Sequence, residues 1–186
     1  ATPTGSMGFP ETAIGIFPGL GGMLRMARFT GPELAKYYVF TGSPISAEDA
    51  HTFGIVARLV APAEVASAIN ELVSAGKPDK YRQRAIPEKF NTLAQMGSSE
   101  NVDRLLNGQP PEGVPAELAA KAAKMIGYKA PLALKIANEI IDEQVGKSIA
   151  DAVEIELGRL NEIFSTADAL EGLSTIGRKK PEYKGA

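Results

Sequence analysis

Residues 8–22 read GFPETAIGIFPGLGG and place one carboxylate, Glu11, among apolar and glycine-rich chain. Pro10 restrains the backbone just before this acid, because the proline ring fixes φ. Residues 18–22 form a Pro-Gly-x-Gly-Gly turn, and a helical pattern follows from Gly21 to Arg28. A helix N-terminus favours negative charge, so the stretch predicts a stiff turn that presents a single acid beside a helix start.

The composition is that of an ordinary globular domain and excludes several kinds of chemistry. The chain has 186 residues, of which 44% are hydrophobic and 23% charged. Its net charge of -2 gives no reason to expect a nucleic-acid partner, and the absence of cysteine excludes disulfides and thiolate chemistry. No apolar run approaches the roughly 20 residues that span a bilayer, and no signal-peptide pattern opens the chain. We therefore expect a cytoplasmic protein with no membrane partner.

The single histidine, His51, excludes two further classes of catalytic site. A Ser-His-Asp relay needs a histidine beside its nucleophile, and an HExxH zinc site needs two histidines. We expect His51 to be a plain surface residue and the chain to hold no metal. Any chemistry must then rest on carboxylates, backbone amides or a bound cofactor.

The predicted elements are mostly helices. A helix is expected over residues 33–40, and another is capped by Ser46 and ended by Gly54. Residues 55–60 have the composition of a strand, and most of the chain after Pro62 has helical patterns. A strand needs partners and one strand cannot make a core, so the chain resembles the second part of a larger fold.

Near the end of the chain, five apolar residues recur at helical spacing. A last helix, capped by Ser165 or Thr166, is expected to run towards Arg178. The apolar stripe consists of Ile149, Val153, Leu157, Leu160 and Phe164.

Four ordered blocks of the sequence resemble the crotonase (enoyl-CoA hydratase/isomerase) superfamily. The first is the glutamate turn at residues 8–22, which is similar to the second active-site signature of that family. The others are TGSPISAEDAHTFGIV at 41–56, APLALK at 130–135, and FSTADALEG at 164–172 with RKKP at 178–181. The resemblance covers nearly the whole chain, but only the C-terminal half of the family's fold.

The resemblance implies an α/β, crotonase-like (ClpP/crotonase) ββα spiral core of which only the C-terminal part is here, followed by a mainly α-helical region. Residues 1–76 would be the end of the spiral core with the active-site turn, and residues 115–186 a helical region for oligomerisation and CoA contact. Residues 77–114 would be an extra helical and loop segment. This segment resembles the hydratase part of a fused 3-hydroxyacyl-CoA dehydrogenase/enoyl-CoA hydratase.

The same resemblance implies hydration of a 2-trans-enoyl-CoA to a 3-hydroxyacyl-CoA in fatty-acid degradation. Glu11 matches the acid that protonates C2, and Gly19 the residue whose N–H holds the attacking water. Pro18, Arg178 and Lys179 would contact the substrate or its CoA. No separate cofactor is implied, because coenzyme A is part of the substrate.

Other interpretations remain open at this stage. With one candidate catalytic glutamate, Glu11, the chain also fits an enoyl-CoA isomerase. It also fits a non-catalytic CoA-binding or assembly fragment. Taken without the surrounding blocks, Glu11 also fits a solvated acid in a turn. Arg178 and Lys179 also fit basic residues that compensate the dipole at the C-terminus of a helix. The resemblance implies a homotrimer or dimer of trimers, with an N-terminal half of the same enzyme that supplies the oxyanion amides and a second glutamate.

Overall fold

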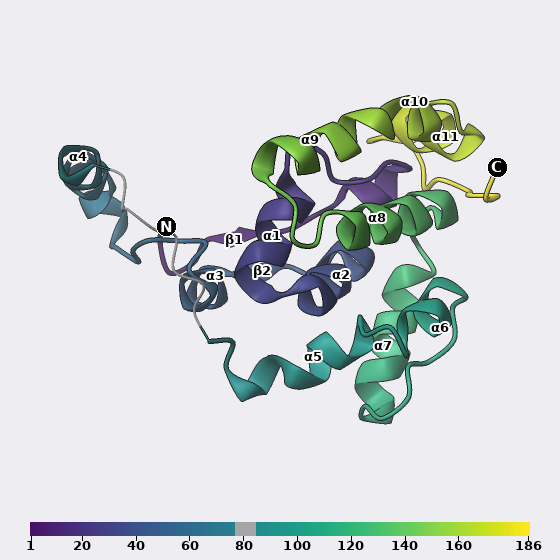
Figure 1. Cartoon of the computed structure of the whole chain (residues 1–186), viewed down its shortest axis with the longest axis horizontal. Helices are drawn as coiled ribbons and strands as arrows, with labels where there is room; N and C mark the ends of the chain where they lie inside the picture. Colours follow the sequence, from purple (N-terminus) through teal and green to yellow (C-terminus); the bar gives the residue numbers. More distant parts are fainter. Residues whose placement is uncertain (77–84) are drawn as a thin grey trace.

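The computed structural model describes residues 1–76 and 85–186, and the described chain is mainly helical (Figure 1). Two short strands, β1 (Ser6–Met7) and β2 (Ile45–Ser46), pair antiparallel. Ser6 lies opposite Ser46 in this ladder. The pair fastens the start of the chain to the residues that lead into the third α-helix.

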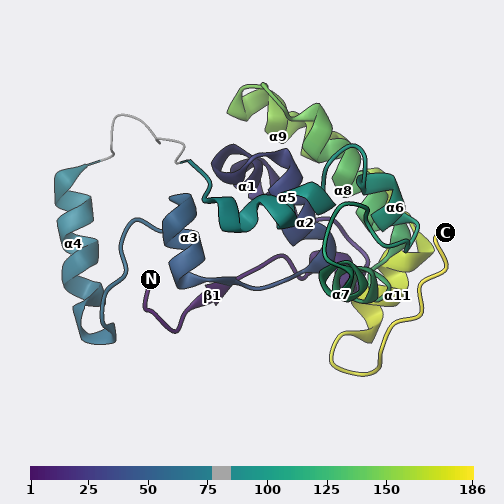
Figure 2. The same ribbon diagram turned by 90° about the horizontal axis from the view of Figure 1, so that it is seen from below.

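A central helix, α2 (Pro32–Thr41), is buried along its whole length from Leu34 onwards. It packs against α1 (Gly22–Thr30), α5 (Asn91–Met96), α7 (Ala116–Ile126) and α8 (Pro131–Glu143), which surround it in Figures 1 and 2. A helix that is apolar on all sides is stable only inside a core. Its one lysine, Lys36, is held by an ion pair with Asp142 of α8, with 2.7 Å between the charged atoms.

The helix α3 (Ala47–Phe53) begins and ends as the sequence predicts. Ser46 accepts a hydrogen bond from the Asp49 N–H at 3.0 Å, and Gly54 follows the helix with a φ of 87°. His51 is half-buried, with its Nδ1 2.9 Å from the Val56 carbonyl oxygen, so the expectation of a plain surface residue was wrong.

The strand predicted over residues 55–60 is wrong, because this segment is irregular. It runs beside the first residue of the chain, where the Val60 N–H donates to the Ala1 carbonyl at 3.0 Å. The Ala1 amino group donates to the Arg58 carbonyl at 2.8 Å. A composition suited to strands makes a strand only where a neighbouring strand pairs along its length, and the described residues offer none here.

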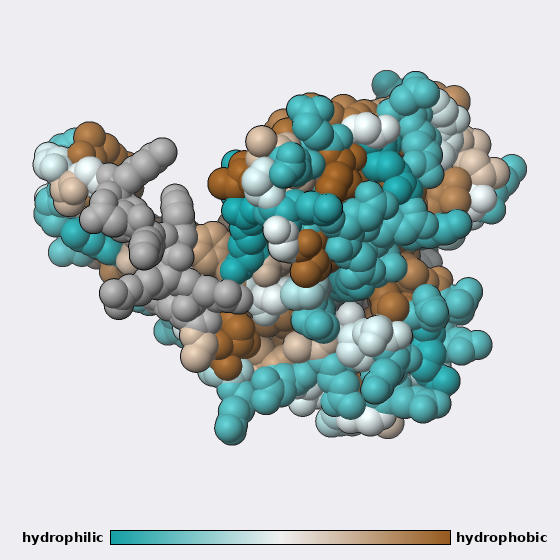
Figure 3. All heavy atoms as spheres, viewed as in Figure 1, coloured by the Kyte–Doolittle hydropathy of each residue, from teal (hydrophilic) through white to brown (hydrophobic). Residues whose placement is uncertain are grey.

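After the turn η2 (Pro62–Glu64), helix α4 (Val65–Ala75) stands apart from the other helices in both ribbon views (Figures 1 and 2). An ion pair of 2.7 Å between Arg58 and Glu71 ties it to the preceding segment. Three of its apolar side chains are exposed: Ile69, Leu72 and Val73. Figure 3 shows brown, hydrophobic atoms on this arm of the molecule.

Residues 77–84, with the first part of the predicted extra segment, lie outside the described residues. From residue 85 that segment contains η3 (Glu88–Phe90), α5 and α6 (Val102–Leu106). The buried side chains of Phe90, Met96 and Leu105 join the main core. The domain boundaries proposed from the sequence stay predictions.

The C-terminal region contains α9 (Ile149–Gly158), α10 (Leu160–Phe164) and α11 (Ala167–Thr175). Thr166 caps α11 as predicted, but this helix ends at Thr175, before Arg178. The apolar stripe found in the sequence is only partly buried, and its member Leu160 packs against the core. Three of its members are more than half exposed, and the fully buried positions are Ala152, Glu156 and Ile163: the exposed members are Ile149, Leu157 and Phe164.

Candidate active site

Glu11 begins η1 (Glu11–Ile14), a single helical turn that is fixed from several directions. The buried Thr12 hydroxyl donates to the Val39 carbonyl of α2 at 3.3 Å. The Ala130 N–H, just before α8, donates to the Thr12 carbonyl at 2.9 Å. These bonds attach the turn that carries Glu11 to two core helices.

The C-terminal tail closes over the same turn. The Tyr183 hydroxyl donates to the Ala13 carbonyl at 2.6 Å, and burial raises the pKa of Tyr183 to about 12. The tail is itself held by Asp168, a buried residue of α11, whose carboxylate accepts from the N–H groups of Lys184 at 2.7 Å and Gly185 at 2.9 Å. The backbone of η1 therefore has little freedom.

Glu11 lines a pocket of about 270 Å³ together with Gly19. Its Oε2 atom is buried and has no hydrogen-bond partner among the described residues. Burying a carboxyl oxygen without a partner is unfavourable, and such groups cluster at sites that act on a ligand. The remaining lining residues are all apolar: Ile16, Phe17, Leu20, Leu160, Ile163 and Phe164.

The turn at residues 19–21 brings Gly19 to this pocket. The residue that follows Gly19 has a sparsely populated backbone conformation. Leu20 has a φ of 56° and is fully exposed, and Gly21 has a φ of 72°. A leucine with positive φ is uncommon, because its Cβ crowds the backbone. The turn is closed by the Gly22 N–H, which donates to the Gly19 carbonyl at 3.1 Å, and by Arg25, whose Nη1 donates to the Leu20 carbonyl at 2.8 Å.

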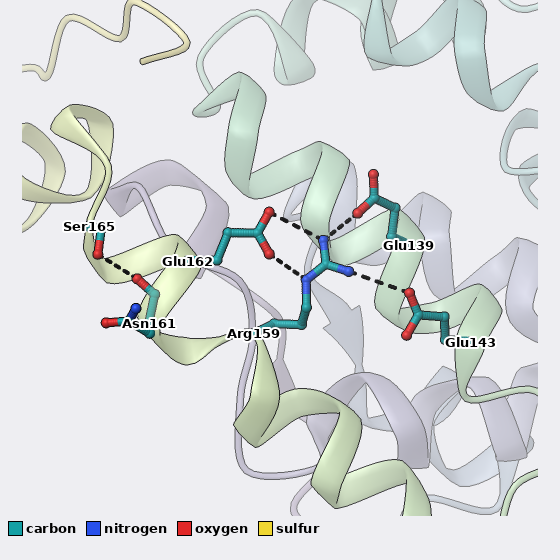
Figure 4. A network of polar contacts seen from close by, with 6 residues as sticks. All are labelled: Glu139, Glu143, Arg159, Asn161, Glu162 and Ser165. Carbon is teal, nitrogen blue, oxygen red and sulfur yellow. Dashed lines mark hydrogen bonds and ion pairs between the residues drawn. The ribbon is translucent and has the colours of Figure 1, made fainter.

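The other wall of the pocket is α10, and an ion-pair network holds that helix against α8 (Figure 4). Arg159, which directly precedes α10, pairs with Glu139 and Glu143 of α8 and with Glu162 of α10. The hydrogen bond to Glu139 raises the pKa of Arg159. The network thus positions the apolar side chains of α10 opposite Glu11.

The remaining predicted site residues lie elsewhere. Pro18 is buried within the turn and does not line the pocket. Arg178 and Lys179 are exposed beyond the end of α11, where the Lys179 Nζ pairs with Glu171 at 3.0 Å. The structure brings Glu11 and Gly19 to one pocket, and the roles of all five residues stay predictions.

Two buried carboxylates near the site have no distinguishing sequence signal of their own: Glu156, which contacts the glycine turn, and Asp168. The helical spacing of apolar residues around Glu156 gave no reason to single out the acid. Asp168 falls within a block that resembles the crotonases, but its role as an anchor for the tail depends on where residues 184–185 return.

Among the described residues, no group of three acidic or histidine side chains is arranged to hold a metal ion. In the same residues, no helix is both long and apolar enough to cross a membrane.

Comparisons with known proteins match the whole chain to one family. The family described as enoyl-CoA hydratase/isomerase matches residues 1–185. A relative named probable enoyl-CoA hydratase 2, mitochondrial, from Arabidopsis thaliana is 29% identical over 96% of this chain and 43% of its own length. A fatty acid oxidation complex subunit alpha from Pseudomonas syringae is 32% identical over 61% of this chain and 17% of its own length.

Among solved structures, an enoyl-CoA hydratase from Rhodobacter sphaeroides aligns with a TM-score of 0.72 and 25% identity. The alignment covers 99% of this chain and 56% of that one. The chain thus spans about half the length, or less, of these relatives. The mostly helical structure is consistent with a partial crotonase-like α/β fold, and the chain belongs to the enoyl-CoA hydratase/isomerase family of the crotonase superfamily.

Proposed function

We propose that this chain carries part of the active site of an enoyl-CoA hydratase, with Glu11 as the acid that protonates C2 of the substrate. The observation that carries the proposal is the buried, unpartnered Oε2 of Glu11 in an otherwise apolar pocket that also exposes Gly19. A carboxyl group held in this way is free to exchange a proton with a ligand, because no protein group competes for it. The enoyl-CoA hydratase names of its relatives support the same chemistry.

Hydration adds the oxygen of water to C3 of the enoyl thioester and a proton to C2. Glu11 delivers the C2 proton, and the Gly19 N–H holds the water that attacks C3. A second base, outside this chain, accepts the proton that this water loses. The apolar side chains of α10 exclude bulk water and face the acyl chain, and charge on the thioester oxygen is stabilised by backbone N–H groups that also lie outside this chain.

We propose that the second base and the oxyanion N–H groups come from polypeptide equivalent to the portion of the relatives that this chain does not span. Pro18, Arg178 and Lys179 then contribute to substrate and CoA binding, and no cofactor beyond the CoA of the substrate is needed. The similarity to fatty acid oxidation complex alpha subunits supports a role in acyl-CoA degradation and a fusion to a hydroxyacyl-CoA dehydrogenase. We further propose a trimer or dimer of trimers in the cytoplasm.

The test is steady-state hydration of crotonyl-CoA by the full-length protein that carries this chain. The substitution Glu11→Gln removes the transferable proton with little change in shape, so kcat should fall by about 10²–10⁴-fold. Glu154→Gln is the matched control, because Glu154 is an exposed glutamate on α9. A fall below about 10-fold for Glu11→Gln would contradict the assigned role.

One alternative is supported by the same residue. An isomerase that moves a proton between C2 and C4 works with a single carboxyl group, and this chain contributes one to the pocket. Assays with a 3-enoyl-CoA separate the two. Conversion of 3-enoyl-CoA to 2-enoyl-CoA without formation of 3-hydroxyacyl-CoA would establish the isomerase and exclude the hydratase.

A further inference from the structure

The glycine turn of the site is attached to a buried carboxylate on α9. Glu156 is 4% exposed, and its Oε2 accepts a hydrogen bond from the Gly21 N–H at 2.8 Å. Gly21 is the residue that precedes α1, so this N–H is one of those that a helix leaves unpaired at its start. The two partners are 135 residues apart in the sequence, and their bond links α9 directly to the turn beside Gly19.

The same carboxylate is oriented by a second contact. Its Oε1 accepts from the Gln144 Nε2 at 3.1 Å, and this Nε2 also donates to the Ala152 carbonyl at 2.8 Å. Gln144 is itself buried, with 3% exposure. Each carboxylate oxygen of Glu156 therefore accepts a hydrogen bond, one from the Gly21 N–H of the turn and one from Gln144.

The role of the buried glutamate follows from the N–H group that it serves. An apolar residue on the buried face of α9 would avoid the cost of removing a carboxylate from water. The carboxylate does supply a partner for a buried N–H in a turn where Leu20 already has an unfavourable positive φ. Arg25 holds the same turn from the exposed side through the Leu20 carbonyl. Arg25 and Glu156 therefore hold the carbonyl and the N–H of one peptide unit, the one that joins Leu20 to Gly21.

We propose that Glu156 is a positioning residue for the active site. Its bond to the Gly21 N–H holds residues 19–21 in the single conformation that presents Gly19 to the pocket of Glu11. Glu156 is absent from the lining of the pocket. The inference rests on the proposed function for its catalytic consequence, but the bond to the turn is testable without any activity.

Loss of this bond should affect catalysis more than substrate binding. The water held at Gly19 must sit at reacting distance from C3, and a displacement of about 1 Å costs about 100-fold in rate. The proposed CoA contacts of Arg178 and Lys179 lie beyond the end of α11 and should persist. In the full-length protein we expect Glu156→Leu to lower kcat by about 10–100-fold while KM changes less than about 3-fold.

The conservative variant Glu156→Gln should give a graded effect. Its carboxamide retains an acceptor for the Gly21 N–H, but it then turns an NH₂ group towards the NH₂ of Gln144. The two NH₂ groups can avoid each other only if the Gln144 side chain rotates and loses its hydrogen bond to the Ala152 carbonyl. We expect Glu156→Gln to recover most of the kcat lost in Glu156→Leu, whereas Glu154→Gln on the exposed face of α9 should match the parent protein.

The direct readout is amide hydrogen exchange of the Gly21 N–H in the same four proteins. We expect exchange at Gly21 to accelerate at least about 10-fold in Glu156→Leu, less in Glu156→Gln and not in Glu154→Gln, with the core of α2 unchanged. If Glu156→Leu does not fold, the comparison of Glu156→Gln with Glu154→Gln decides the matter.

Unchanged exchange at Gly21 in Glu156→Gln and Glu156→Leu would overturn the proposal. So would a loss of kcat that only follows the fraction of unfolded protein. If the parent protein does not hydrate enoyl-CoA, the proposed function fails while the exchange measurement still decides whether Glu156 holds the turn.

Discussion

Replacement of Glu11 should make the protein more stable while it removes activity. The Oε2 atom of Glu11 is buried and has no hydrogen-bond partner among the described residues. An unsatisfied buried polar group costs about 1–3 kcal/mol of folding free energy. Methionine has a similar shape and no such group, so Glu11→Met should raise the free energy of unfolding by about 1–3 kcal/mol.

For a domain of this size, each kcal/mol corresponds to a shift in Tm of about 2–4 °C. We therefore expect Glu11→Met to unfold at least about 2 °C above the parent in thermal unfolding followed by circular dichroism at pH 7. Glu11→Gln keeps polar atoms in the same place and should gain less, which makes it the matched control. A stability loss above about 1 kcal/mol in Glu11→Met would refute the reasoning, because it would mean that the carboxyl group is engaged in stabilising contacts.

Three further predictions concern the support of the site. Asp168→Ala should lower the free energy of unfolding by about 1–3 kcal/mol and accelerate amide exchange at residues 184–185, because it removes the acceptor of two backbone N–H groups. Burial raises the pKa of Tyr183 from its usual value of 10 to about 12 in the folded protein. Its contribution to the free energy of unfolding is therefore complete below pH 10 and is lost as the pH rises to 12. A urea titration across that range should show the loss in the parent protein and a smaller one in Tyr183→Phe. Gly172→Ala would place a Cβ 2.2 Å from the Ile14 carbonyl oxygen, so it should displace η1 and cost about 1–3 kcal/mol in thermal unfolding.

Local signals in the sequence predicted the helix boundaries that depend on a few neighbouring residues. Ser46 and Thr166 cap helices as expected, because the hydroxyl and the amide that it serves lie three residues apart. Pro32 and Pro131 begin helices, since proline suits the first helical position. Glu11 and Gly19 line one pocket, and the catalytic roles that the family resemblance implies for them stay predictions.

Features that depend on distant chain were not predicted. Residues 55–60 have strand composition but no partner strand among the described residues, so they lie as irregular chain beside Ala1. The apolar stripe from Ile149 to Phe164 follows one helical period, but the helix is interrupted at Arg159, between α9 and α10. The fully buried positions of the two helices are Ala152, Glu156 and Ile163, and Leu160 alone of the stripe packs against the core beside them. No periodicity argument places a glutamate inside a core, because the reason for its burial is an N–H group 135 residues away.

The central claim is that Glu11 exchanges a proton with C2 of an acyl-CoA. The most direct measurement is exchange of the C2 protons of butyryl-CoA, a saturated analogue that cannot be hydrated, with deuterium oxide, followed by proton NMR in the presence of the full-length protein. We predict enzyme-dependent exchange that Glu154→Gln retains and that Glu11→Gln slows by at least about 100-fold. Exchange at the parent rate in Glu11→Gln would contradict the assignment of Glu11 as the C2 acid.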